Sequence, residues 1–267
     1  MTSESSRNYD TASESAVRYD IKDAARYLAI APSTLRYWER EGLVRSERNP
    51  ANDYRQYSLH SLIDASEIAF YRQLGVPVKE LKDYHALTIE ALDDALARSD
   101  ESIQWRMEEL IAARKRIAHQ RTLNLLAENL QREGLRTGHP DIEQLSEIDY
   151  ENRAIWTLLV DQPWRYGLYI DAERPDIAIE AIVDASPEGD TLWSRDELGA
   201  NTRCLEGLLR APAYGEGSNA ADLLQAAKSK GIKPACIAAS YLVTAVDAEG
   251  GPRTDYYRAW IIGAESH

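Results

Sequence analysis

The sequence predicts an α+β protein built from three successive parts. Residues 18–85 combine short helical patterns with one turn-rich, extended stretch, whereas residues 86–133 carry a continuous helical pattern. Residues 148–267 alternate β-branched and aromatic runs with turns and include one helical segment. Between the last two parts, turn formers at residues 134–147 predict a linker.

Length and composition limit the class of protein. At 267 residues, 44% of them hydrophobic, the chain can bury one large core or two small ones. No apolar run approaches the roughly 18 residues of a membrane span, so we expect no membrane partner and a cytoplasmic location. Residues 1–17 are rich in Ser, Thr and Glu and lack the apolar core of a signal peptide, which predicts a disordered tail.

Charge is unevenly distributed along the chain. The formal net charge is −13, yet residues 17–84 hold 11 Lys and Arg against 10 Asp and Glu, a net of +1. Residues 134–267 hold 12 basic against 22 acidic residues, a net of −10. An acidic C-terminal half therefore masks a near-neutral N-terminal part, and the whole-chain charge says little about the local field there.

The reactive residue types form no recognisable catalytic or metal-binding pattern. A disulfide between Cys204 and Cys236 is one interpretation, and two separate buried thiols of a cytosolic protein are the favoured one. The five histidines are scattered without metal-ligand spacing, and there is no Ser-His-Asp or Cys-His arrangement. We therefore expect no metal, no cofactor and no enzymatic activity.

Residues 20–42 predict two short helices joined by a tight turn. Asp20 can cap the first helix, and Pro32 suits the first position of the second. Gly42 can end the second helix in a left-handed conformation. With a polar outer face on the second helix, such a pair is a helix-turn-helix, whose second helix enters the major groove. An ordinary amphipathic surface hairpin is the alternative.

Residues 45–58 predict a β-hairpin wing, because turn formers separate two short extended pieces. Its Arg and Tyr side chains suit hydrogen bonds to phosphates. A third helix should end at Gly75, and a short fourth should start at Pro77. The predicted DNA-binding residues of the second helix and the wing are Ser33, Thr34, Arg36, Tyr37, Arg40, Arg48, Tyr54, Arg55 and Tyr57.

Three segments, "TLRYWEREGLV", "DYRQYS" and "FYRQLGVPVKEL", follow one another in the order and at the spacing of the MerR family of transcription regulators. Residues 18–85 thus resemble the winged helix-turn-helix DNA-binding domain of that family. The chain departs at Ala31, where a hydroxyl cap is common, and at Trp38, where tyrosine is usual; a missing cap costs about 1 kcal/mol. The resemblance implies double-stranded promoter DNA and RNA polymerase as partners, with activation through distortion of the promoter.

The long helix carries an apolar seam at heptad-like spacing, formed by Ile103, Met107, Leu110, Ile117 and Leu130. A solvated helix of this length would be marginal alone, so a partner helix is expected. In MerR-family proteins the matching helix pairs antiparallel with its twin, which implies a dimerisation helix, an antiparallel coiled coil and a homodimer. Packing on the chain's own C-terminal domain alone is the alternative.

Five runs after residue 148 are interpreted as strands: "RAIWTLLVD", "RYGLYIDA", "DIAIEAIVDA", "ASYLVTAVDA" and "DYYRAWIIGA". A helix, "SNAADLLQAAKSKG", precedes the last hairpin. The stretch "AAKSKGIKPACIAASYLVTAVDAEGGPRTDYYRAWIIGA" resembles the second half of the GyrI-like effector-binding domain of multidrug-sensing MerR relatives. The resemblance implies a C-terminal GyrI-like α+β domain that binds a small-molecule effector.

Aromatic residues are concentrated in this last part of the chain. Tyr and Trp offer electron-rich faces that suit planar or cationic ligands, although core packing explains any single one equally well. Multidrug-sensing relatives carry an acidic residue where this chain has Tyr241 or Leu242; Glu180, expected to share a face with Asp176 and Asp184, could replace it. The predicted ligand-binding residues are Trp156, Tyr169, Glu180, Tyr241, Tyr256 and Trp260.

Together these features predict a ligand-responsive, homodimeric, DNA-binding transcription regulator that senses a small aromatic molecule, either cationic or neutral. We expect the ligand to change transcription more than DNA affinity. Two alternatives stay open. One is a GyrI-like hydrolase that uses Glu180 as a base, and the other is a drug-sequestering binding protein.

Overall fold

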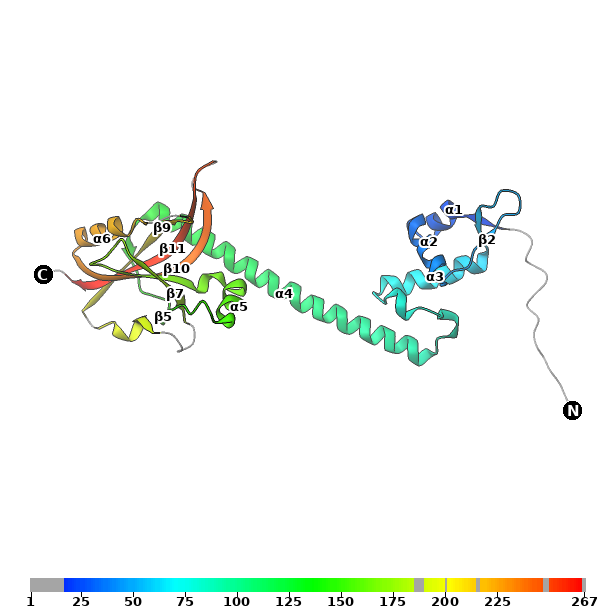
Figure 1. Cartoon of the computed structure of the whole chain (residues 1–267), viewed down its shortest axis with the longest axis horizontal. Helices are drawn as coiled ribbons and strands as arrows, with labels where there is room; N and C mark the ends of the chain where they lie inside the picture. The colour runs from blue at the N-terminus through cyan, green and yellow to red at the C-terminus, as the bar shows by residue number, and fades with distance from the viewer. Residues whose placement is uncertain (1–16, 185–189, 200, 215–216, 247–249, 266–267) are drawn as a thin grey trace. The chain divides into compact units, whose positions relative to one another are not determined.

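The computed structural model describes residues 17–184, 190–199, 201–214, 217–246 and 250–265. The disordered tail predicted for residues 1–17 lies, except for its last residue, outside the described part. The chain divides into two compact units, Met1–Ala112 and Ala113–His267. The boundary falls within the long helix, so each unit contains part of that helix (Figure 1).

Local sequence signals set the first two helices of the N-terminal unit. α1 (Ile21–Tyr27) begins at Asp20, whose carboxylate accepts hydrogen bonds from two backbone N–H groups at 2.7 and 2.8 Å. α2 (Pro32–Arg40) begins on a proline and has no side-chain cap at Ala31. Gly42 follows α2 with φ of 78°, a left-handed conformation that glycine adopts without steric cost.

The wing is part of a three-stranded antiparallel sheet with the order β1-β3-β2. The predicted hairpin corresponds to β2 (Glu47–Arg48) and β3 (Arg55–Tyr57). β1 (Tyr19–Asp20), just before α1, adds a third strand along β3 and makes it the central strand. α3 (Leu59–Gln73) follows and ends shortly before Gly75, which has φ of 89°.

The prediction of a short fourth helix that starts at Pro77 is wrong. The segment forms two 3₁₀ turns, η1 (Val78–Glu80) and η2 (Tyr84–Ala86), instead of an α-helix. Asp83, between them, has φ of 55°, a left-handed conformation that cannot continue a right-handed helix. The core of the unit is formed by buried side chains from α1, α2, β3 and α3, together with Leu81.

α4 (Ile89–Glu133) is one helix of 45 residues and ends at Gly134, which has φ of 69°. Near its start, Ala95 is buried in the N-terminal core. Near its end, Ala127 and Leu130 are buried against the C-terminal unit. Charged residues occur throughout α4, and none of the described helices combines the length and apolarity needed to cross a bilayer.

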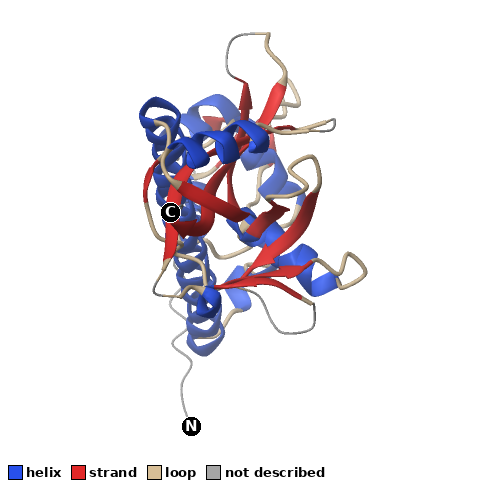
Figure 2. Cartoon of the chain, turned by 90° about the vertical axis from the view of Figure 1, so that its left-hand side faces the viewer, coloured by secondary structure: helices blue, strands red, loops and turns tan. Residues whose placement is uncertain are grey.

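The C-terminal unit is built on an eight-stranded antiparallel sheet with the order β4-β9-β11-β10-β6-β7-β5-β8. Its strands, red in Figure 2, twist relative to one another. They are β4 (Arg136–Thr137), β5 (Gln144–Glu147), β6 (Tyr166–Asp171), β7 (Ala178–Val183), β8 (Thr191–Ser194), β9 (Thr202–Pro212), β10 (Ile232–Val246) and β11 (Arg253–Glu265). Two helices, α5 (Arg153–Asp161) and α6 (Ala220–Ser229), complete the unit.

The linker predicted at residues 134–147 is wrong, because this segment belongs to the sheet. β4 pairs with β9, and β5 pairs with both β7 and β8. Gly138, interpreted as a linker glycine, lies so close to the sheet that a Cβ there would be 2.6 Å from Cβ of Glu206. The glycine therefore marks a close approach of two chain segments.

The run "RAIWTLLVD", predicted as a strand, is helix α5. Asn152 caps it by accepting a hydrogen bond from the backbone N–H of Ala154 at 2.9 Å. Ile155, Leu158 and Leu159 recur at helical spacing, which is the signal that distinguishes this short apolar run from a strand.

Cys204 and Cys236 are both free thiols in one buried cluster. They lie on β9 and β10, on either side of β11, and each pairs with Ile262. Two strand spacings put their Cα atoms roughly 10 Å apart, beyond the reach of a disulfide. Burial raises the pKa of the Cys236 thiol to about 12, so it stays protonated and unreactive at neutral pH.

Candidate nucleic-acid interface and pocket

α2 has a buried face and an exposed, basic face. Leu35 and Trp38 point into the N-terminal core, whereas Arg36, Tyr37 and Arg40 are exposed. The guanidinium of Arg40 lies over the ring of Tyr37, 5.3 Å from its centroid. Within the described part of the chain, no carboxylate forms an ion pair with Arg36, so its donors are available to a ligand. Ser33 is also exposed, and Thr34 is half-buried.

The wing presents an ordered tip. Nη1 of Arg48 donates a hydrogen bond to the carbonyl oxygen of Asp53 at 2.9 Å across the turn. The side-chain oxygens of Asn49 and Asn52 accept hydrogen bonds from backbone N–H groups within the same turn at 2.9 and 3.0 Å. These bonds fix the loop before Tyr54, whose ring is exposed.

Glu39, which the sequence analysis did not single out, connects α2 to the wing. Its Oε2 accepts a hydrogen bond from Nε of Arg55 at 2.7 Å, and its Oε1 accepts one from the hydroxyl of Ser46. Arg55 is therefore partly neutralised and held in one orientation. An acidic residue on a polar helix face usually indicates only solvation, so no local sequence signal predicts this contact.

The prediction that Tyr57 contacts a phosphate is wrong. Its side chain is completely buried in the N-terminal core, because it lies on the face of β3 that packs against the helices of this unit. Burial and the nearby charge of Glu39 raise the pKa of Tyr57 to about 12. A side chain in this position stabilises the core and is not accessible to DNA.

The C-terminal unit contains a cavity of about 620 Å³. Strands β6, β7, β10 and β11, with the end of β9 and residues near α5, supply its walls. One wall carries three tyrosine rings: the centroid of Tyr257 lies 6.2 Å from that of Tyr166 and 5.7 Å from that of Tyr241. An apolar, electron-rich surface is therefore exposed to whatever fills the cavity.

Carboxylates supply the charge of this cavity. Asp176, Glu180 and Asp255 line it, and none of its described lining residues is Lys, Arg or His. The hydroxyl of Tyr150 donates a hydrogen bond to Glu180. Burial, reinforced by a hydrogen bond to Glu180, raises the pKa of Tyr166 and likewise that of Tyr150, the latter to about 12. Both hydroxyls therefore stay protonated, and the cavity carries a formal charge of −3.

A series of side-chain hydrogen bonds lies on the β10 and β11 side of the cavity. The hydroxyl oxygens of Tyr241 and Thr244 are 2.6 Å apart, and the hydroxyl of Thr244 also donates to Asp255. Asp184, expected to share a face with Glu180, instead points away. Its φ is 48°, and its carboxylate accepts hydrogen bonds from the backbone N–H groups of residues 143 and 144.

Of the six predicted ligand-binding residues, Glu180 and Tyr241 line the cavity and the other four do not. Trp260 is fully buried in a core cluster, and Tyr256 is buried beside α4. Tyr169 packs against the same cluster as Trp260, and Trp156 is an exposed residue of α5. Two tyrosines of the wall, Tyr166 and Tyr257, and the carboxylate of Asp255 were not among the predicted residues.

Alternation along the strands explains these corrections. Asp255 and Tyr257 are two residues apart on β11 and share a face, whereas Tyr256 and Trp260 occupy the opposite face. On β6, Tyr166 and Tyr169 are three residues apart and therefore also lie on opposite faces of the sheet.

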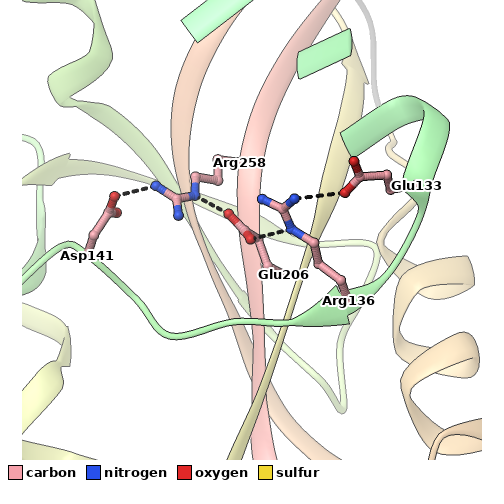
Figure 3. A network of polar contacts seen from close by, with 5 residues as sticks. All are labelled: Glu133, Arg136, Asp141, Glu206 and Arg258. Carbon is pink, nitrogen blue, oxygen red and sulfur yellow. Dashed lines mark hydrogen bonds and ion pairs between the residues drawn. The ribbon is translucent and has the colours of Figure 1, made fainter. Parts of the chain in front are cut away.

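The opposite face of the sheet holds a network of charges around Glu206 (Figure 3). The side chain of Glu206 is only 5% exposed and accepts hydrogen bonds from Nε of Arg136, at 2.8 Å, and from Nε of Arg258. Arg136 also binds Glu133 in the last turn of α4, and Arg258 also binds Asp141. The network therefore joins β9, β11 and the end of α4.

Solved structures with some similarity to this chain include a MerR-family transcriptional regulator from Bacillus cereus. It is 17% identical, with a TM-score of 0.35, over 46% of this chain and 88% of that one. The cryo-EM structure of an EcmrR–DNA complex in EcmrR-RPo is 15% identical, with a TM-score of 0.34, over 91% of this chain and 99% of that one.

Sequence comparison supports the assignment of the N-terminal unit. The HTH-type transcriptional regulator ZntR of Escherichia coli (strain K12) is 23% identical over 124 residues, which is 46% of this chain and 86% of ZntR. Residues 19–87 match the family described as MerR HTH family regulatory protein. This range contains α1, α2, the wing and α3. The N-terminal domain of this chain is therefore a helix-turn-helix domain of the MerR type.

Proposed function

We propose that this protein is a DNA-binding transcription regulator whose C-terminal unit binds a small-molecule effector. The observation that carries the proposal is the exposed face of α2 in a domain that matches the MerR model. On this face Arg36 has no ion-pair partner among the described residues, and Arg40 is stacked on Tyr37. The second helix of a helix-turn-helix enters the major groove, where Arg36 contacts base edges. Arg48 and Tyr54 of the wing contact phosphates.

The protein acts as a homodimer joined by α4. Four members of the predicted apolar seam are exposed within one chain: Ile103 by 43%, Met107 by 56%, Leu110 by 65% and Ile117 by 59%. The fifth, Leu130, is a correction, because it is buried against strands of its own C-terminal unit. Antiparallel pairing with α4 of a second copy removes this seam from water. The two α2 helices then meet two half-sites of an inverted repeat in promoter DNA, where RNA polymerase is the further partner.

Selection from a random duplex library by the full chain is expected to enrich an inverted repeat. Leu110→Glu places a charge in the seam, so this variant is expected to sediment as a monomer and to lose selection of the paired half-sites. Glu108→Gln, at an exposed position of the same helix outside the seam, serves as control and should behave like the wild type. An inverted repeat selected equally well by monomeric Leu110→Glu would contradict the dimer, and no enrichment by the wild type would contradict DNA recognition.

The effector is an aromatic cation that occupies the cavity of the C-terminal unit. Three tyrosine rings and three carboxylates line this cavity without a basic side chain among its described lining residues. A cation relieves the repulsion between the carboxylates, and its aromatic rings pack on the tyrosines. This combination supports the GyrI-like effector-binding domain and favours a cationic over a neutral ligand.

Glu180→Gln is expected to weaken binding of the probe tetraphenylphosphonium about tenfold, as loss of one partly solvated charge contact implies. Calorimetry on the full chain measures the affinity. Glu173→Gln removes the same charge at an exposed position outside the cavity and should leave the affinity unchanged. Equal affinity for tetraphenylphosphonium and neutral triphenylphosphine oxide would contradict the cationic ligand class.

The hydrolase and sequestration alternatives gain no specific support. Glu180 already accepts a hydrogen bond from the hydroxyl of Tyr150. This geometry favours a fixed charge that attracts a cation over a base that activates water.

A further inference from the structure

An irregularity in β10 separates the cavity from α4. Tyr241 pairs with Tyr257 of β11, and Val243 pairs with the preceding residue, Tyr256. Leu242 is therefore an extra residue on β10, which makes this point a β-bulge. On its other side, β10 pairs with β6 only up to Ser240. Among the described residues, Leu242 thus has no register partner on either neighbouring strand.

The bulge shapes one wall of the cavity. In a regular strand, residues three apart point to opposite faces, but the extra residue brings Tyr241 and Thr244 to the same side. Both line the cavity, and their hydroxyl oxygens are 2.6 Å apart. Thr244 is held in turn by Asp255 of β11. A molecule that fills the cavity therefore contacts the residues on both sides of the bulge.

The bulged residue itself belongs to the α4 side of the sheet. The side chain of Leu242 is 1% exposed and packs in one cluster with Ala127 and Leu130 of α4. Its carbonyl oxygen accepts a hydrogen bond from Nε2 of Gln120, also on α4, at 2.8 Å. The same Nε2 lies 2.9 Å from Oδ1 of Asn124, one turn further along the helix, which orients the amide of Gln120.

We propose that the β-bulge at Leu242 transmits occupancy of the cavity to α4, with Gln120 as the positioning residue. The proposal rests on the proposed function, because it assumes that the cavity binds an effector. Because the carbonyl oxygen of the bulged residue Leu242 accepts a hydrogen bond from Gln120, the shape of the bulge and the position of Gln120 depend on each other. Ligand contact with Tyr241 and Thr244 favours the bulged form, which docks α4 more firmly on the sheet.

A double-mutant cycle tests this link without any ligand. Hydrogen exchange of backbone amides in peptides covering residues 113–133 is measured on the full chain. Thr244→Val, which breaks the hydroxyl chain in the cavity, is expected to speed this exchange about fivefold. In a Gln120→Glu background, where the donor to Leu242 is already missing, Thr244→Val should add less than about twofold. Independent effects of the two substitutions would overturn the proposal.

Tetraphenylphosphonium tests the link in the other direction. It is expected to slow exchange in the same peptides about fivefold in the wild type, but less than about twofold in Gln120→Glu at saturation. Gln131→Glu adds the same charge to the same helix at an exposed position and should respond like the wild type. Equal slowing in Gln120→Glu would overturn the link.

The double-mutant cycle and the tetraphenylphosphonium experiment together distinguish failure of the link between the cavity and α4 from failure of the proposed function. A non-additive cycle in a protein that does not bind tetraphenylphosphonium would support the link and contradict the effector class. Binding of tetraphenylphosphonium together with an additive cycle would support the effector class and overturn the link.

Discussion

Arg36→Ala is expected to weaken binding of the full chain to its selected duplex by about 10- to 100-fold, the range for one lost base-reading arginine. Arg36 projects from the exposed face of α2 without a carboxylate partner among the described residues, so its guanidinium is free to bind bidentately in the major groove. Arg55 differs, because Glu39 already engages it. Fluorescence anisotropy with a labelled duplex measures the affinity.

Arg36→Lys distinguishes a base contact from a phosphate contact. Lysine retains the charge but loses the planar, two-donor geometry, so it should not restore affinity if Arg36 reads a base. The slope of log affinity against log salt should also change little for a base contact, whereas a lost phosphate contact lowers it by about 1. Arg203→Ala, which removes one positive charge from the C-terminal unit, is the control. Full rescue by lysine would contradict base reading.

The N-terminal unit was predictable from sequence because its determinants are local. The cap at Asp20, the proline at the start of α2 and the left-handed Gly42 each act within a few residues. Tyr57 was assigned wrongly because its burial depends on tertiary packing against the helices of this unit, which no pattern within the wing predicts. The Glu39–Arg55 pair spans 16 residues and likewise depends on tertiary structure.

The cavity was less predictable because its residues come from strands distant in sequence. Residue type alone cannot decide between Tyr256 and Tyr257, since adjacent strand residues face opposite sides and the register is unknown. Alternation along the strand could still have grouped these residues by face. Tyr256 and Trp260 are an even number of residues apart and share one face, whereas Tyr257 lies on the opposite face. On β10, the extra residue at the bulge reverses the face on which the following residues lie, and no alternation pattern predicts this.

Glu206→Ala is expected to lower the free energy of unfolding of the C-terminal unit by about 3 kcal/mol, because it leaves two arginines without their shared buried partner. Removal of one partner of a buried ion pair costs about 3–5 kcal/mol. We expect the lower end of this range, because the side chain of Arg136 is 38% exposed and water screens its charge. Urea unfolding of the full chain, followed by tryptophan fluorescence, measures the change. Glu133→Gln, which removes only the exposed partner of Arg136, should cost less than about 1 kcal/mol.

The pH dependence of this effect has a definite sign. Burial alone would raise the pKa of the Glu206 carboxyl, but the hydrogen bonds and charges of Arg136 and Arg258 outweigh it and hold the pKa below its usual value. The carboxylate therefore contributes its full stabilisation above the pKa of an unfolded glutamate, about 4.3, and loses it as the pH falls through the lower pKa of the folded state. Glu206→Gln mimics the protonated form, so the stability gap between it and the wild type should shrink as the pH is lowered through that window. A gap of the same size at pH values far above and below the window would show that the packing of this side chain, and not its charge, holds the end of α4 to the sheet.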